Sequence, residues 1–388
     1  MSAVRIATGL AADDGGVDAF AEAASRAQLG LGGARPDLVM VFAGTPNLDH
    51  VDDGVEAVRD RLGEDCALLG CGAQGVVGAG RELEEGGVVV WAASLPAGQV
   101  ESFQLDAVPT DEGQVAISGV PEMAAADATI MLADPYTFPV EPLLAQLGQD
   151  YPGLPIIGGI ASAATGPGEG VLFHDDEVVG EGAVGAVLRG VDVHPCVSQG
   201  ATPVGPEMMV TAGEANVINE LASKPALVRL REAISELGAE ERVMASGGLL
   251  LGIVIDPNQP EYERGDFLVR GILGVDQETG AVTVGEHVRV GQVVRLHVRD
   301  GRSADADLRR VLDRELSALA APPAGALVFT CNGRGRGMFG QPDHDAAALD
   351  AAFGGAPAAG FFCAGEIGPV GPRNFLHGFT ATVAVFPG

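Results

Sequence analysis

Two short loops near the C-terminus carry residue types that suit the binding of a small polar molecule. The first loop is Cys331-Asn332-Gly333-Arg334-Gly335-Arg336, and the second is Cys363-Ala364-Gly365-Glu366. Arginine presents a planar fork that matches a carboxylate, and alternating glycines let backbone N–H groups converge on an anion. A glutamate in the second loop can meet a cation or an arginine. The two loops therefore predict a site for a small ligand.

The same cysteines also permit nucleophilic catalysis. A thiol becomes a nucleophile when a base lies beside it, and His344 or His377 could serve Cys331 or Cys363 in this way. Because nothing in the sequence brings these groups together, we expect a binding protein rather than an enzyme and assign no catalytic residue. In a third interpretation both loops are structural, with Cys363 filling a small apolar space.

Two further motifs do not predict a cofactor site. Gly70-Cys-Gly-Ala-Gln-Gly75 has G-x-G-x-x-G spacing, but a dinucleotide loop must open a helix, and residues 76–87 have no helical apolar pattern. We expect a tight structural loop there. Metal binding by His287 and His297, or by His344 with Asp343 and Asp345, lacks the spacing of a zinc site. We expect no metal, no other cofactor, and histidines that face solvent.

The composition limits which binding partners and which cellular compartment we expect. A net charge of −30 over 388 residues opposes binding to nucleic acid or to an anionic membrane surface. No apolar run approaches the roughly 20 residues that span a bilayer, and no signal peptide opens the chain, which predicts a cytoplasmic protein. The five scattered cysteines indicate reduced thiols: Cys66, Cys71, Cys196, Cys331 and Cys363. A single lysine among many alanines and arginines is typical of a GC-rich prokaryotic genome.

A repeated plan positions the two loops. Three segments each read as strand, helix, strand, glycine-rich loop and further strands. They are 37–42, a helix ending near 62, 67–70 and 87–92; then 128–132, 142–147, 155–158 and the paired strands 170–173 and 183–187; then 326–330, 346–353, 358–360 and 379–386. The loops align on Gly70, Gly158 and Gly360. In a β-α-β unit the loops after the strands form the ligand-facing edge, so Cys331 and Cys363 would share one edge.

A different region separates the second and third units. Residues 214–237 carry apolar residues at helical spacing, including Val217 and Leu221, and predict two helices that meet at Pro225. Runs at 248–255, 267–273, 281–284 and 292–299 predict an antiparallel meander, and 305–319 an amphipathic helix. The expected fold is α/β, with repeated β-α-β units, appended β-hairpins and an antiparallel β-meander insertion, in two domains.

These residues resemble the FIST family, in which a FIST N domain precedes a FIST C domain. The N-terminal resemblance rests on 37–42, Leu69-Gly-Cys-Gly-Ala-Gln-Gly75, Gly158-Gly-Ile-Ala-Ser162, Val197-Ser-Gln-Gly200 and Pro203-Val-Gly205. The C-terminal resemblance is more specific and rests on Cys331-Asn-Gly-Arg-Gly335, Gly360-Phe-Phe-Cys-Ala-Gly-Glu-Ile-Gly368 and 374–380. It implies an N-terminal strand and helix at 1–36, a FIST N domain at 37–222 and a FIST C domain at 223–388.

The resemblance also implies a function. The family is regarded as a sensory module for signal transduction that binds small ligands such as amino acids, and it offers no established catalytic residues. Arg334 or Arg336 would then hold a carboxylate, and Asn332 and Glu366 an ammonium or other polar group. The full set of expected ligand-binding residues is Cys331, Asn332, Arg334, Arg336, Cys363, Glu366, Asn374 and His377. The chain shows no kinase, methyl-accepting or diguanylate cyclase segment, so we expect a standalone sensor-like unit without a direct signalling output of its own, to which a signalling partner protein could bind. The alternative is a thiol-dependent enzyme that uses Cys331 or Cys363.

Overall fold

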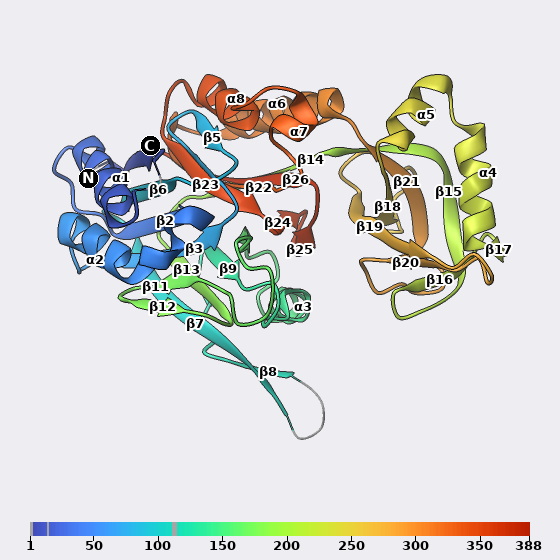
Figure 1. Ribbon diagram of the computed structural model, residues 1–388, viewed down its shortest axis with the longest axis horizontal. Helices are drawn as coiled ribbons and strands as arrows, with labels where there is room; N and C mark the ends of the chain where they lie inside the picture. Colours follow the sequence, from blue (N-terminus) through green and yellow to red (C-terminus); the bar gives the residue numbers. More distant parts are fainter. Residues whose placement is uncertain (1–2, 14, 111–114) are drawn as a thin grey trace. The chain divides into compact units, whose positions relative to one another are not determined.

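The computed structural model describes residues 3–13, 15–110 and 115–388. The chain divides into two compact units (Figure 1). The first contains residues 1–197, 308–376 and 381–388, and the second contains residues 198–307 and 377–380. The candidate loops that begin at Cys331 and Cys363 both belong to the first unit.

The first unit contains three sheets built on one plan, which confirms the repeated α/β architecture. In each sheet a β-α-β segment supplies two parallel neighbouring strands. The last strand of the repeat pairs antiparallel with the first of these two, and a further strand pairs with that last strand. The first sheet has the order β1 (Arg5–Ala11), β6 (Val88–Ser94), β2 (Leu38–Gly44), β3 (Ala67–Ala73), β11 (Leu172–His174) and β12 (Glu177–Val179). The second has β8 (Val115–Ser118), β7 (Gln99–Pro109), β13 (Ala183–Arg189), β9 (Ala128–Ala133), β10 (Ile156–Ile160), β24 (Gly365–Val370) and β25 (Arg373–His377). The third has β14 (His194–Gln199), β26 (Thr380–Pro387), β22 (Pro323–Cys331), β23 (Ala358–Cys363), β4 (Val76–Gly78) and β5 (Arg81–Leu83).

Each repeat gives its hairpin to another repeat. The hairpin β4–β5 follows β3 in the chain but pairs with β23, β11–β12 follows β10 but pairs with β3, and β24–β25 follows β23 but pairs with β10. The expectation that the strands at 170–173 and 183–187 pair with each other is therefore wrong, because β11 and β13 lie in different sheets. The exchange brings residues 76–83 to the sheet that carries Cys331.

Three glycines mark equivalent crossing points of the repeats. Gly70, Gly158 and Gly360 are the register partners of Val41, Met131 and Val328 on the parallel neighbour strand. A Cβ atom at each glycine would lie 1.9, 1.8 and 1.6 Å from the partner's carbonyl oxygen, respectively. Only glycine tolerates such an approach. The alignment of these glycines in the sequence thus reports a real steric requirement.

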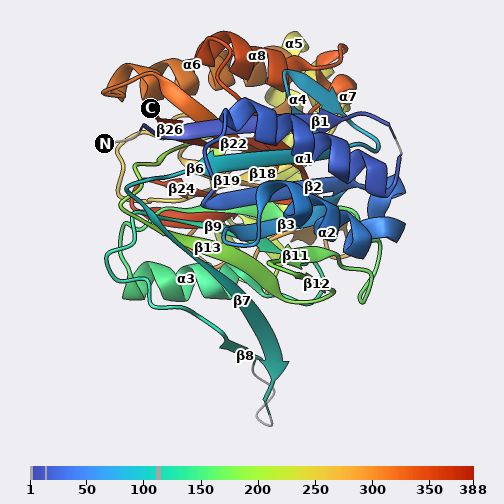
Figure 2. The same ribbon diagram turned by 90° about the vertical axis from the view of Figure 1, so that its left-hand side faces the viewer.

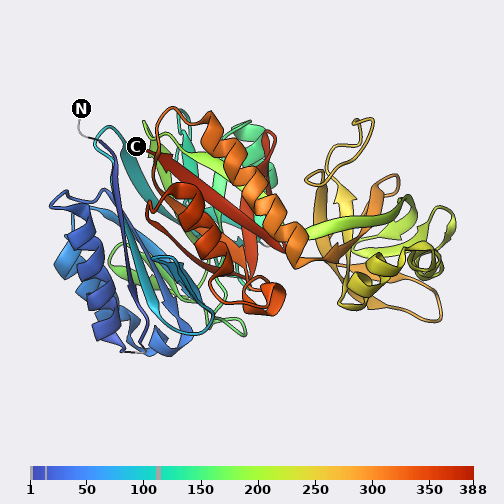
Figure 3. The same cartoon turned by 90° about the horizontal axis from the view of Figure 1, so that it is seen from above.

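Helices cover the outer faces of the sheets, and a shared core lies between them (Figures 2 and 3). Helices α1 (Val17–Leu31) and α2 (Val51–Leu62), preceded by the 3-10 turn Thr45–His50, cover the first sheet, and α3 (Val140–Asp150) covers the second. Helices α6 (Gly301–Ala318) and α8 (His344–Phe353) cover the third, and the short α7 (Arg336–Phe339) lies before α8. The shared core contains Phe42, Phe329 and Phe361, whose rings lie 4.9–6.5 Å apart between centroids.

The second unit contains the expected antiparallel sheet. Its strand order is β15 (Ala201–Glu214), β21 (Val293–Arg299), β18 (Leu249–Val254), β19 (Phe267–Val275), β20 (Val282–Val284), β16 (Val217–Leu221) and β17 (Lys224–Pro225), and β15 also pairs with β16. That pairing closes the sheet into a barrel. Helices α4 (Ala226–Glu236) and α5 (Ala239–Ser246) follow β17.

The prediction of a helix over residues 214–224 is wrong, because Val217–Leu221 is the strand β16. A spacing of four residues places Val217 and Leu221 on one face of a helix or equally on one face of a strand. Left-handed backbone at Ala215 and Ala222 turns the chain at both ends of the segment. Hydrogen-bonded pairing with β15 and β20 then stabilises this segment as a strand rather than a helix.

Among the residues that the structure describes, no helix is both long and apolar enough to cross a membrane.

Candidate functional site

The ends of β22 and β23 place the two cysteines side by side. Cys331 and Cys363 are register partners on parallel strands, which confirms that the two loops share one sheet edge. The preceding partners on the same face, Phe329 and Phe361, make a ring contact in the core. Cys363 is fully buried, whereas Cys331 is half-buried. The next residue, Asn332, is exposed, and its backbone N–H donates to the carbonyl oxygen of Cys363.

Arg334 is buried and its fork is already occupied. Its Nε and Nη2 atoms donate to the two carboxylate oxygens of Asp345 at 2.6 and 2.9 Å, a bidentate pair in which both side chains are almost fully buried. Thr330 Oγ1 donates to the same carboxylate at 3.0 Å. The remaining nitrogen, Nη1, is buried without a hydrogen-bond partner among the described residues. Arg334 therefore fixes the loop and keeps one spare donor. The sequence suggests instead a free guanidinium that could bind a ligand carboxylate with both nitrogens.

The ion pair determines the charges of the buried cluster formed by Thr330, Arg334 and Asp345. Burial alone would raise the pKa of the Asp345 carboxyl, but the charge of Arg334 and hydrogen bonds from His344 and Arg334 outweigh it and hold that pKa well below its ordinary value. Burial likewise opposes the charge on Arg334, yet attraction to Asp345, and then to Cys331 and Glu366, raises the pKa of the guanidinium. The cluster is thus charged on both sides at neutral pH.

His344 is buried in this cluster, so the expectation that it faces solvent is wrong. Its Nδ1 atom lies 3.0 Å from Asp345 Oδ1, and its ring stacks on Phe339 with 3.5 Å between centroids. The Phe339 ring also faces the guanidinium of Arg334, 5.2 Å from its centroid. The expectation for His297 is wrong as well, because that side chain is fully buried in the second unit, where burial lowers its pKa to about 4. His287 is exposed, as expected.

The other four expected ligand residues lie in different surroundings. Arg336 is exposed at the start of α7, and Glu366 is fully buried on β24, opposite Gly159 of β10, where it interacts electrostatically with Arg334. Asn374 has a different role: its side chain accepts from the N–H of Ile156 and donates to the carbonyl of Leu154, so it holds the start of β10. His377 belongs to the second unit.

The G-x-G-x-x-G loop is structural, as expected. Gly75 is followed directly by strand β4 rather than by a helix. A Cβ at Gly75 would lie 2.3 Å from the carbonyl oxygen of Leu83, so glycine is required by the tight hairpin. The Ser198-Gln199 motif is also structural. Asp307 accepts from Ser198 Oγ at 3.1 Å and from the Gln199 N–H at 2.8 Å within the second unit.

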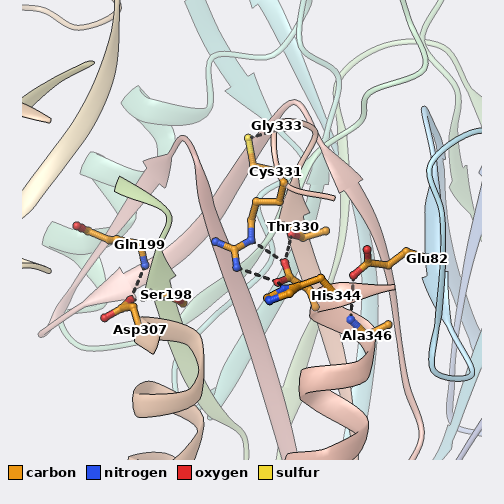
Figure 4. Close-up of polar contacts among 11 residues, drawn as sticks. Glu82, Ser198, Gln199, Asp307, Thr330, Cys331, Gly333, His344 and Ala346 are labelled. Carbon is orange, nitrogen blue, oxygen red and sulfur yellow. Dashed lines mark hydrogen bonds and ion pairs between the residues drawn. The ribbon is translucent and has the colours of Figure 1, made fainter. Parts of the chain in front are cut away.

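The exchanged hairpin β4–β5 completes the cluster with acidic residues that sequence inspection did not single out. Glu82 Oε1 accepts the N–H of Ala346 at 2.9 Å, in the first turn of α8 (Figure 4). Asp343 anchors the hairpin in return, accepting the N–H of Glu82 at 2.7 Å and pairing with Arg81 at 3.1 Å. Glu84 accepts the N–H of Arg336 at 2.7 Å. The N-terminal half of the chain thus supports the loops of the C-terminal half.

Glu82 gives the protein a pH-dependent stability. Burial, and then the like charge of Asp345, raises the pKa of its carboxyl to about 7, from an ordinary value of about 4.3. The folded state therefore holds this proton more tightly than the unfolded state. The stabilisation is complete below about pH 4 and is lost as the pH rises through about 7.

We expect Glu82→Gln to gain stability relative to wild type as the pH rises through that window. The glutamine keeps an acceptor for Ala346 but cannot ionise, so the difference in the free energy of unfolding between the variant and wild type should grow by about 3 kcal/mol between about pH 4.5 and 7.5. The buried His297 contributes equally to both curves and cancels in that difference. Urea unfolding across that range measures it. Glu85→Gln, an exposed carboxyl near the same hairpin, should follow wild type. Parallel curves for Glu82→Gln and wild type would show that the Glu82 carboxyl does not titrate in this way.

This α/β architecture exchanges hairpins between its repeats and places paired loops at the ends of β22 and β23, and family models match the chain in two parts. A FIST N domain matches residues 37–224 and a FIST C domain matches residues 226–369. The chain belongs to the FIST family, whose domains are recognised as sensory domains. The boundary expected at residues 222 and 223 stays a prediction.

Relatives of nearly the same length occur in mycobacteria. The uncharacterized protein Rv0628c of Mycobacterium tuberculosis (strain ATCC 25618 / H37Rv) is 43% identical over 384 residues, which cover 99% of this chain and 100% of the relative. The uncharacterized protein Mb0898c of Mycobacterium bovis (strain ATCC BAA-935 / AF2122/97) is 42% identical over 384 residues, with 99% of both chains covered.

Proposed function

We propose that this protein is a sensor that binds a small polar ligand, with amino acids as the first class to test, at the loops that follow β22 and β23. The observation that carries the proposal is the buried pair Arg334–Asp345, which leaves the Nη1 donor of Arg334 without a hydrogen-bond partner and interacts electrostatically with the half-buried Cys331. An unpaired buried N–H costs about 1–3 kcal/mol, so a ligand oxygen that reaches Nη1 recovers that cost on binding.

The exposed members of the loops would make the first contact. Asn332 offers an amide and Arg336 a guanidinium at the solvent side of the same turn, and these groups suit the polar substituent and the carboxylate of an amino acid. Glu366 adds a buried carboxyl group on the neighbouring sheet. A partner protein would receive the signal.

A thermal-shift screen of amino acids and related carboxylates tests the proposal. A ligand at 100 times its dissociation constant stabilises the folded state by about 2.7 kcal/mol, which gives a readily measured rise in Tm. We expect Asn332→Ala and Arg336→Ala to bind the hit at least tenfold more weakly without a change in their own Tm. Arg373→Ala, which removes an exposed arginine elsewhere on the first unit, is the matched control. A hit that binds all four proteins equally would place the site elsewhere.

A thiol-dependent enzyme is the second candidate, and Cys331 is the cysteine that favours it. Its sulfur accepts the N–H of Gly333 at 3.4 Å and is attracted by Arg334. Cys363 is unsuited, because burial, and then the charge of Glu366, raises the pKa of its thiol well above the ordinary value. Cys331→Ser separates the candidates: a sensor keeps its ligand, whereas an enzyme loses all turnover of it.

A further inference from the structure

The inner faces of β22 and β23 carry a column of paired side chains that ends in two thiols. The register partners are Leu327 with Ala359, Phe329 with Phe361, and Cys331 with Cys363. The second pair makes an edge-to-face ring contact at 5.8 Å, as expected of register partners whose side chains leave the same face of the sheet. Adjacent strands lie about 4.8 Å apart, within the Cα separation of about 4.4–6.8 Å that a disulfide requires. Cys331 is the last residue of β22, where the backbone can adjust.

The two thiols differ in the way that a reactive and a resolving cysteine differ. Cys331 is half-buried, and both the Gly333 N–H and the Arg334 cation favour negative charge on its sulfur. Cys363 is fully buried, and its thiol stays protonated because burial, and then the charge of Glu366, raises its pKa well above the ordinary value.

We propose that Cys331 and Cys363 form an intramolecular disulfide when a hydroperoxide oxidises Cys331. The Cys331 thiolate attacks the peroxide, the O–O bond breaks, and a sulfenic acid and hydroxide form. The Cys363 sulfur then attacks the Cys331 sulfur, the S–O bond breaks, and water leaves. With hydrogen peroxide, two thiols and one peroxide give one disulfide and two waters. The inference does not depend on whether the loops bind a ligand.

The closed disulfide would change the candidate loops directly. It would tie the end of β22 to β23 and withdraw the Cys331 sulfur from Gly333. The turn that presents Asn332 and Arg334 would then be fixed in a second arrangement. The protein would thereby report peroxide as a covalent change at the sheet edge.

Peptide mapping of the full chain tests this proposal. The reduced protein is treated with hydrogen peroxide, blocked with N-ethylmaleimide and digested with trypsin. The sequence places Cys331 in peptide 315–334 and Cys363 in peptide 337–373, while Cys66 and Cys71 share peptide 62–81. We expect free thiols to fall from the five in the sequence to three, and 315–334 to be recovered linked to 337–373.

Two variants give the matched controls. Cys331→Ser should keep Cys363 reduced under the same treatment, and Cys363→Ala should accumulate Cys331 as sulfinic acid, because no resolving thiol is present. Circular dichroism verifies that each variant is folded. A link between 62–81 and 337–373, sulfinic Cys331 in the wild-type protein, or five thiols that all survive peroxide would each overturn the proposal.

Discussion

Replacing Arg334 by methionine is expected to lower the free energy of unfolding by about 3–5 kcal/mol at neutral pH. The substitution leaves the carboxylate of Asp345, which is 2% exposed, without its bidentate partner. Thr330 and His344 remain beside Asp345, but neither supplies the two charge-assisted donors that Arg334 provides. Urea unfolding of the full chain, monitored by circular dichroism, measures the loss.

Two further variants distinguish a broken ion pair from lost packing. Arg334→Met combined with Asp345→Leu removes both charges and should regain most of the loss, since apolar replacement of a whole buried pair is often neutral. Arg81→Met breaks the exposed pair with Asp343 and should cost less than about 1 kcal/mol. A loss below about 1 kcal/mol for Arg334→Met would mean that the pair does not hold the loop. The same reasoning makes Arg334 a poor choice for testing ligand binding, because its removal disturbs the fold.

Replacing Gly360 by valine is expected to destabilise the protein by at least about 3 kcal/mol, the upper end of the usual overpacking cost. The new Cβ would lie 1.6 Å from the carbonyl oxygen of Val328 on the neighbouring strand, so β22 and β23 would have to separate. That separation would also move Cys331 away from Cys363. Tm and the yield of folded protein measure the effect.

The repeats provide internal comparisons for this substitution. Gly70→Val and Gly158→Val meet the same obstacle, at 1.9 and 1.8 Å from a carbonyl oxygen, and should be similarly severe. Gly337 has nothing within 4 Å of a Cβ, so Gly337→Val should be tolerated within about 1 kcal/mol, the scale of helix propensities. If all four variants were equally stable, the three glycines would not be equivalent crossing points.

The repeated units could be predicted because their constraints are local. A strand crossing that admits only glycine leaves a glycine in the sequence, and Gly70, Gly158 and Gly360 align for that reason. Parallel pairing of the strands within a β-α-β unit then follows from the connecting helix. The position of Cys331 and Cys363 at one edge of the sheet could therefore be predicted from the sequence.

The partners of Arg334 and the origin of the supporting hairpin could not be predicted. Asp345 meets Arg334 only because the chain folds back through α7, and neither residue type nor spacing records that turn. The hairpin of Glu82 pairs with β23 although it follows β3, and no local pattern states which sheet edge a hairpin joins. An isolated Asp-His-Asp run at 343–345 was the one available signal, and it resembled a weak metal motif more than a buried ion pair.

Protection of Cys331 from alkylation tests the central claim most directly. A ligand bound between the ends of β22 and β23 covers the half-buried Cys331 sulfur, so a hit from the thermal-shift screen should slow iodoacetamide labelling of peptide 315–334 at least tenfold at saturation. Asn332→Ala should need at least tenfold more ligand than wild type for the same protection. If the hit raises Tm while the labelling rate of Cys331 stays unchanged, the ligand does not bind at these loops and the account of the site is wrong.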